Sequence, residues 1–423
     1  MNTNRRLVLW TLYDFSASIA VVVYLVYFSQ WLVVENHVSD IWYNLIFVGA
    51  SALLLITVPV ASVMADKRNS RMSFLRITTL CQFSALFLTG CVASYLPHTP
   101  SVIALAVVFY FIAIYLHQFA LVFYNALLPD ISRGGSLGRT SGLGQLAKSF
   151  GTVAGILISL PFAHGSIRIL GHPGRSQTFL PATVIAFLLT LPSLFQSEPP
   201  RGSKSATAYP HPDGYRDLAR RLAQCPGLIP FLVTFFLFND AILTIQDNLP
   251  IYMQRVLMIP DKSKTLLIAL GLLAAAIGSI VGGKLSDRLG YKKVLTSILI
   301  CWMILVPCMS LVRRVAIFAL FSTSVGVVFG ATWAISRALM ARLAPRDQVS
   351  HSFGYYTIVE RFSTFFGPLT WGLIVTLLNQ LGTARYRVAL GSMSVFIGIS
   401  ILTLKLVPTD SAQRPDPTLC ELP

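Results

Sequence analysis

Seven polar residues interrupt otherwise apolar stretches of the sequence and are the first candidates for chemistry. Charge in an apolar environment is costly, so such residues usually face a cavity or one another. Acids beside cations would suit a zwitterion, because the acids hold an ammonium group and a guanidinium holds a carboxylate with two hydrogen bonds. The alternative is that these groups form structural ion pairs between helices. The candidates are three acids, two bases and two amides: Asp14, Asp240, Glu360, Lys148, Arg361, Asn125 and Asn239.

The stretches that must position these residues are long enough to cross a membrane. Hydrophobic residues make up 54% of the 423 positions and charged ones 12%, whereas a soluble domain carries roughly a quarter charged residues. Apolar runs of about 20 residues, which span a bilayer core as a helix, recur along the chain. The first run is too long for a signal peptide and contains Asp14. We predict about twelve transmembrane helices, near 8–33, 41–65, 74–96, 101–128, 142–163, 179–196, 228–250, 265–286, 294–312, 315–341, 353–378 and 387–407.

The net charge of +16 could suggest a nucleic-acid partner, but the positions of the charges argue against one. Most of the 33 lysine and arginine residues fall in alternate loops, on the side that holds the N-terminus. This bias sets orientation, so we expect both termini in the cytoplasm. Membrane lipids with anionic headgroups are the expected secondary partners of the basic loops. The six cysteines show no disulfide or metal-site spacing.

The two halves of the chain echo each other around a long polar stretch. Aligning Asp66 with Asp287 pairs the loop after the second span with the loop after the eighth, and Lys148 pairs with Glu360 in spans 5 and 11. Several echoes in the same order argue for a duplicated six-helix unit. We predict an N-terminal six-helix bundle over 1–196, a cytoplasmic linker over 197–226, a C-terminal six-helix bundle over 227–407 and a cytoplasmic tail over 408–423.

Two copies of one loop motif are candidates for a gate. The copies read "SVMADKRNSR" from Ser62 and "GKLSDRLGYK" from Gly283. Each aspartate ends a span that runs toward the cytoplasm, where a carboxylate is unfavourable unless it meets the positive N-terminus of another helix. The alternative is a basic turn that only fixes topology. The gating candidates are Asp66, Lys67, Arg71, Asp287, Arg288, Gly290, Lys292 and Arg337.

The second copy resembles the loop signature of the major facilitator superfamily, whereas the first has Ser62 and Asn69 in place of both glycines. In that superfamily the helix that meets the aspartate belongs to the opposite half and locks the cytoplasmic gate. The resemblance implies that Asp66 meets the start of span 11 and that Asp287 meets the start of span 5. It also implies that spans 3, 6, 9 and 12 form an outer support, which agrees with the absence of acids and bases from their interiors.

Further segments are similar to the vacuolar amino-acid effluxers, a group that includes many bacterial proteins of unassigned substrate. Those segments are "LYDFSAS", "FYNALLPDISRGGSLGRTSGLG", "PFLVTFFLFNDAILTI", "SRALMARLAPRDQVSHSFGYY" and "FGPLTWG". Two departures lie at expected cavity positions. The chain has Ser16-Ala17-Ser18 where the group has Ala-Asn-Ser, and Asp240-Ala241 where it has Asp-Gly. These two positions are therefore where a difference in substrate choice within the group would arise.

Together these features predict an all-α membrane protein with the major facilitator fold, in two pseudo-symmetric six-helix bundles. We expect a secondary active or facilitative transporter that moves small polar solutes by alternating access, in particular amino-acid or related metabolite efflux. The Tyr-Asp-Phe of the first span also resembles cation-coupled sugar symporters of the glycoside–pentoside–hexuronide type, and lipid translocation is a further alternative. The motifs of common enzyme classes are absent, so we expect no catalytic residues.

The remaining expectations concern partners and location. We expect a monomer without a cofactor in a bacterial inner membrane. Proton coupling is open, because burial of a carboxylate in a dry cavity favours its protonated form.

Overall fold

The described part of the chain is helical throughout. The computed structural model describes residues 3–132, 136–168, 171–197, 225, 227–345 and 348–408, and no strand occurs among them. Eleven helices in this part are long and apolar enough to cross a membrane. Helices satisfy their own backbone hydrogen bonds, which is why a chain of such hydropathy folds this way in lipid. The predicted fold class, an all-α membrane protein, is confirmed.

The chain forms two compact units, and one helix is divided between them. The first unit comprises Met1–Arg133 and Ala147–Tyr209, and the second comprises Gly134–Leu146 and Pro210–Pro423. Helix α6, Leu137–Ala163, therefore begins in the second unit and continues in the first. Most of the predicted linker, residues 198–224 and 226, lies outside the described residues, as does the tail from residue 409.

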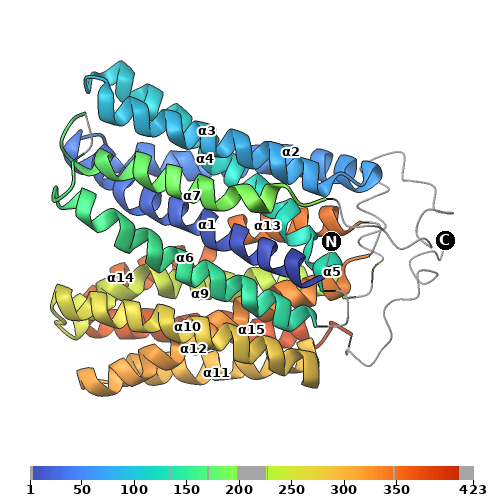
Figure 1. Cartoon of the computed structure of the whole chain (residues 1–423). Coiled ribbons are helices and arrows are strands. Elements are labelled where there is room, and N and C mark those ends of the chain that lie inside the picture. Colours follow the sequence, from blue (N-terminus) through green and yellow to red (C-terminus); the bar gives the residue numbers. More distant parts are fainter. Residues whose placement is uncertain are drawn as a thin grey trace. The chain divides into compact units, whose positions relative to one another are not determined.

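Within the first unit, α3 packs on α4 and α7, and α1 packs on α7 (Figure 1). Stacked aromatic rings fill the interior, as where Tyr24 lies between Tyr110 and Phe179 at centroid distances of 5.9 and 4.7 Å. The elements of this unit besides α6 are α1 (Thr3–Ser29) with a π-helical end (Gln30–Glu35), α2 (Asp40–Arg68), α3 (Arg71–Tyr95), α4 (Pro100–Ala126), the short α5 (Leu128–Ile131), a 3₁₀ turn (Arg175–Thr178) and α7 (Phe179–Leu194).

Within the second unit, α10 packs along α12, while α15 packs on α9 and α11 (Figure 1). Glycine permits the closest of these contacts: a Cβ atom on Gly330 would lie 1.8 Å from the carbonyl oxygen of Ala275. Such small residues let membrane helices approach closely, where dispersion rather than the hydrophobic effect holds them. The elements are α9 (Leu228–Val256), α10 (Asp261–Leu289), α11 (Tyr291–Leu311), α12 (Val315–Leu343), α13 (Val349–Phe362), α14 (Phe366–Leu377), a 3₁₀ turn (Asn379–Leu381) and α15 (Ala384–Leu404).

The eleventh predicted span, 353–378, is not one continuous helix. It consists of α13 and α14, separated at Ser363–Phe365. The local sequence favours the break, because Pro368 has no N–H and its ring clashes with the carbonyl of Thr364 in a continuous helix. Placed in the first turn of α14, the same proline is tolerated. The prediction of a single helix here was wrong, and the Gly367–Pro368 pair inside an apolar run was the signal it overlooked.

Candidate functional site

The break between α13 and α14 is held by two neighbouring residues of α9. The amide nitrogen Nδ2 of Asn239 donates to the carbonyl oxygen of Glu360, 3.2 Å away, and to the hydroxyl of Ser363. Oδ2 of Asp240 accepts a hydrogen bond from the backbone N–H of Gly367 at 2.7 Å. Asn239 therefore donates to a carbonyl group at the end of α13, while Asp240 accepts from an N–H group at the start of α14. Such ends carry backbone groups without partners inside the helix.

Both of these α9 residues are fully buried, with 0% of their surface exposed. The sequence predicted that Asn239 and Asp240 line a solute cavity, whereas the structure gives them direct contacts to the broken span. Ser363 and Gly367 belong to the same arrangement and were not among the predicted site residues. The Gly367–Pro368 pair is compatible with a break, but proline alone does not identify one. Other prolines lie inside continuous helices of this chain: Pro59, Pro161, Pro192, Pro250 and Pro307.

Glu360 and Arg361 lie at the end of α13 beside this break. Their side chains form an ion pair at 3.5 Å and remain accessible, with 20% and 31% of the side-chain surface exposed. Consecutive residues do not share a helix face, and a partly exposed pair at this separation contributes at most about 1 kcal/mol. The pair is therefore available to exchange its internal contact for an external partner.

Three predicted residues lie in the first unit. Asp14 in α1 and Asn125 in α4 are buried, while the side chain of Lys148 in α6 is exposed. Asp14 is flanked in sequence by Tyr13, whose ring stacks on Tyr124 at 5.0 Å. The arrangement of these residues and the C-terminal charges around one cavity stays a prediction, because the two groups belong to different units.

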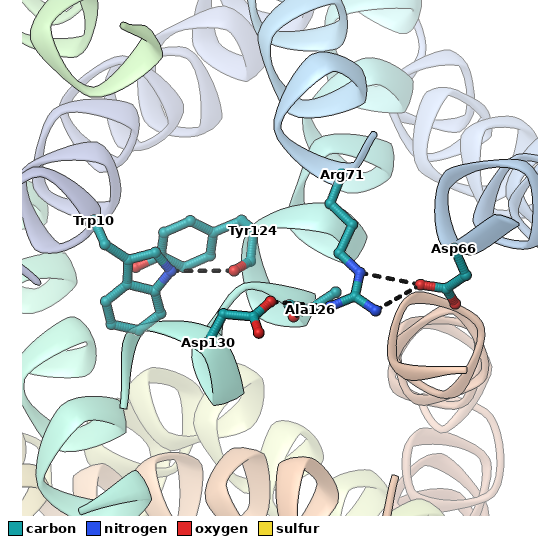
Figure 2. A network of polar contacts seen from close by, with 6 residues as sticks. All are labelled: Trp10, Asp66, Arg71, Tyr124, Ala126 and Asp130. Atoms are coloured by element: carbon teal, nitrogen blue, oxygen red, sulfur yellow. Dashed lines mark hydrogen bonds and ion pairs between the residues drawn. The ribbon is translucent and has the colours of Figure 1, made fainter. Parts of the chain in front are cut away.

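The first copy of the loop motif forms a network of side chains (Figure 2). Arg71 donates through Nε and Nη2 to Oδ1 of Asp66 at 3.0 and 2.8 Å. Its Nη1 contacts Asp130 at 3.1 Å and the carbonyl oxygen of Ala126 at 3.4 Å. One guanidinium thus joins α3 to α2, α4 and α5. The turn between α2 and α3 places Asn69 in the left-handed region, with φ 48° and ψ 47°.

The second copy holds its aspartate differently. The carboxylate of Asp287 accepts backbone hydrogen bonds from Gly138 at 2.8 Å and Arg139 at 2.7 Å, in the first turn of α6. The hydroxyl of Tyr291 donates to the same carboxylate at 2.7 Å. The expected contact between Asp287 and the start of span 5 is confirmed. A negative charge at a helix N-terminus is stabilised by the helix dipole and by N–H groups that lack helical partners.

The start of α6 has a second anchor, Arg337 of α12. Its Nε and Nη2 donate to the hydroxyl and carbonyl oxygens of Ser141 at 2.9 and 2.7 Å. Only 8% of Arg337 is exposed, so its side chain is buried against the start of α6. Glycines allow the close approach, since a Cβ atom on Gly138 would lie 2.3 Å from the carbonyl oxygen of Gly283.

Lys67, Arg288 and Lys292 were also predicted to take part in the gate. Lys67 and Arg288 have exposed side chains. Lys292, the counterpart of Arg71, donates to the carbonyl oxygens of Lys405, at 3.1 Å, and Val407 at the end of α15. The expected contact of Asp66 with the start of span 11 joins residues of different units and stays a prediction. No cluster of three or more metal-ligating side chains occurs in the described part of the chain.

Solved structures with similar folds define the class of protein. The xylose–proton symporter XylE matches with a TM-score of 0.72 and 13% identity, covering 96% of both chains. A bacterial homologue of the iron transporter ferroportin matches with a TM-score of 0.70 and 13% identity, covering 96% of this chain and 99% of that one. The fucose–proton symporter FucP of E. coli matches with a TM-score of 0.69 and 12% identity, covering 94% of this chain and 98% of that one. These likenesses show the major facilitator fold.

The particular family follows from the sequence comparisons. The model described as "Vacuole effluxer Atg22 like" matches residues 138–416, and the chain belongs to this family. An uncharacterised major facilitator transporter of Bacillus subtilis, YxiO, is 24% identical over 300 residues, 69% of this chain and 68% of that protein. The proton-coupled antiporter flippase LtaA of Staphylococcus aureus is 26% identical over 174 residues, 40% of this chain and 42% of that protein. The chain therefore aligns with less than half of LtaA.

Proposed function

We propose that this transporter exports small zwitterionic solutes, amino acids or close relatives, by alternating access. The observation that carries the proposal is the Glu360–Arg361 pair at the end of α13. It presents a carboxylate and a guanidinium 3.5 Å apart, both partly accessible, beside a break in a membrane helix. An ammonium group would bind Glu360 and a carboxylate would bind Arg361, each through a charge-assisted hydrogen bond. The efflux direction is supported by the family description.

Transport in proteoliposomes tests this proposal. Vesicles loaded with labelled amino acids should lose label faster with the wild-type protein than without protein. Glu360→Gln and Arg361→Gln should each raise KM about tenfold or more, because a hydrogen bond to a charged group is worth about 1.5–3 kcal/mol. Asp247→Asn is the matched control, since Asp247 is an exposed acid of the same unit. Unchanged kinetics in both Glu360→Gln and Arg361→Gln would remove this pair as the solute site.

Asp14 and Lys148 are the corresponding candidates of the first unit. We expect Asp14→Asn to weaken the binding of the ammonium group and Lys148→Gln to weaken that of the carboxylate. If instead they form only a structural ion pair, the two variants should lower protein stability and leave the KM of the remaining protein unchanged. Measuring both quantities on the same preparations separates the two roles.

Lipid translocation is the second candidate, favoured by the similarity to the flippase LtaA. A transporter of this kind would move the headgroup through the protein while the acyl chains stay in the membrane. Fluorescent lipid analogues in proteoliposomes test it, because a membrane-impermeant quencher reaches only lipids of the outer leaflet. Faster transbilayer movement that stops in Glu360→Gln, together with no loss of amino acids, would replace the first candidate.

We further propose that the chain lies in a bacterial inner membrane with both termini in the cytoplasm. The excess of lysine and arginine in the loops on the N-terminal side supports this orientation. Reporter fusions test it: alkaline phosphatase should be active after residue 171 and inactive after residue 408. A green fluorescent protein at the same two positions should give the reverse pattern, and any other result contradicts the orientation.

A further inference from the structure

The carboxylate of Asp240 is only half satisfied. Its Oδ2 accepts the N–H of Gly367, and the backbone of Phe365 also faces the carboxylate. Its Oδ1 has no hydrogen-bond partner among the described residues, although the residue is fully buried. A charged oxygen left unsatisfied in a buried site carries a large desolvation cost. The ionised form therefore depends on its contact with the start of α14, where the helix dipole favours negative charge.

The side-chain amide of the neighbouring Asn239 also has an oxygen without a hydrogen-bond donor among the described residues. Asn239 uses Nδ2 on the end of α13, whereas its Oδ1 also lacks a donor among the described residues. Two acceptor oxygens on adjacent residues thus lie buried without a donor beside the break. A hydrogen atom on Oδ1 of Asp240 would remove the charge and turn one of these acceptors into a donor.

Gly367 lets the start of α14 approach this carboxylate closely. A Cβ atom at its position would lie 2.2 Å from the hydroxyl oxygen of Thr244 and 3.0 Å from Oδ1 of Asp240. The hydrogen bond from the N–H of Gly367 therefore depends on a residue without a side chain.

Other titratable groups belong to the elements that pack against α9. On α9 itself they are Asp247, Tyr252 and Arg255, and α14 has none. Two further titratable residues, Glu360 and Arg361, lie at the end of α13 that Asn239 contacts, and their side chains pair with each other. Among the side chains that the structure describes, the remaining ones are His351, Tyr355 and Tyr356 on α13, Arg337 and Arg342 on α12, Lys264, Lys284, Asp287 and Arg288 on α10, and Arg385, Tyr386 and Arg387 on α15.

We propose that Asp240 is a proton-binding site that controls the hinge between α13 and α14. An external proton forms an O–H bond at Oδ1 and neutralises the carboxylate, and no other bond is broken. The hydrogen bond from Gly367 is then no longer made to a charged oxygen, and the favourable interaction between the carboxylate charge and the dipole of α14 is lost. The start of α14 is therefore bound less strongly to α9. Asn239 continues to hold the end of α13 in both states, which makes the segment after Ser363 the one that moves. This coupling rests on the chain acting as a transporter but not on the identity of its solute.

Infrared difference spectroscopy of the purified protein in lipid tests the protonation directly. A step from high to low pH should produce a carbonyl stretch of a protonated carboxyl group in wild type. The band should be missing in Asp240→Asn, present in the control Asp247→Asn, and shifted in Asp240→Glu, which keeps an acid at the position. A wild-type band that survives unchanged in Asp240→Asn would overturn the proposal.

Hydrogen exchange measured by mass spectrometry tests the hinge. Peptides that cover residues 363–370 should exchange about tenfold or more faster at low pH in wild type, after correction for intrinsic rates, as a charge-assisted hydrogen bond is lost. In Asp240→Asn the same peptides should exchange fast at every pH, whereas Asp247→Asn should behave as wild type. A pH response that persists in Asp240→Asn would assign the hinge to another group. Neither experiment uses a solute, so failure of the amino-acid assay leaves both results interpretable.

Discussion

The two copies of the loop motif hold equivalent aspartates in different ways. Asp66 is neutralised by the guanidinium of Arg71, whereas Asp287 accepts two backbone N–H groups at the start of α6. The residues that align with each other take different partners, since Lys292 donates to carbonyl oxygens at the end of α15. A lysine is a single point charge, while an arginine can reach Asp66, Asp130 and a carbonyl oxygen at once. Aligned positions in the two copies of the motif therefore do not determine which partner each side chain contacts.

A further difference lies one loop later. Asp130, the second acid bound by Arg71, has Arg346 as its counterpart in the second half when the prolines Pro129 and Pro345 are aligned. At this aligned position the second half carries a base, followed by Asp347, where the first half carries the acid that Arg71 binds.

The largest expected effect comes from removing the central cation of the first copy. Arg71→Gln leaves Asp66 buried without its counter-ion, with 6% of its side chain exposed, and should cost about 3–5 kcal/mol. The equivalent change Lys292→Gln should cost about 1 kcal/mol or less. Thermal unfolding of the purified proteins in the same detergent compares them, and equal shifts in Tm would contradict the assigned difference.

A smaller effect is expected at the second copy. Asp287→Asn keeps an oxygen for one N–H of α6 but removes the charge, which should cost about 1.5–3 kcal/mol. Hydrogen exchange of residues 137–141 should therefore become about tenfold faster or more. Asp66→Asn serves as the control and should leave that peptide unchanged, so comparable acceleration in both variants would refute a specific role for Asp287.

The turns of the two copies give the smallest expected differences. Gly290 has φ 96° and ψ 140°, outside the left-handed helical region that Asn69 adopts. Gly290→Ala should cost about 1–3 kcal/mol from backbone strain, and Asn69→Ala about 1–2 kcal/mol. Asn69→Gly should be nearly neutral because glycine adopts this conformation readily. Shifts in Tm measure all three, and a larger loss in Asn69→Gly than in Gly290→Ala would reverse the order.

Much of the fold and part of the site followed from the sequence. Hydropathy gave the membrane helices, and the resemblance to the major facilitator loop signature placed Asp287 at the start of span 5, as observed. The break in span 11 was missed, because hydropathy averages over Gly367–Pro368 and reports only that the segment is apolar. The partner of Asp240 was missed for the same reason, since a single continuous helix would leave no N–H group free there.

The sequence by itself determined that this chain spans a membrane many times, contains a repeat, and carries charge in particular helices. These properties depend on residue type and spacing, which decide how much each segment gains from lipid and where a backbone turn can form. Only the tertiary structure decided which partner contacts each charged side chain. That choice depends on distances of about 3 Å between atoms far apart in the chain, and two side chains of like charge at matching positions, Arg71 and Lys292, reach different partners.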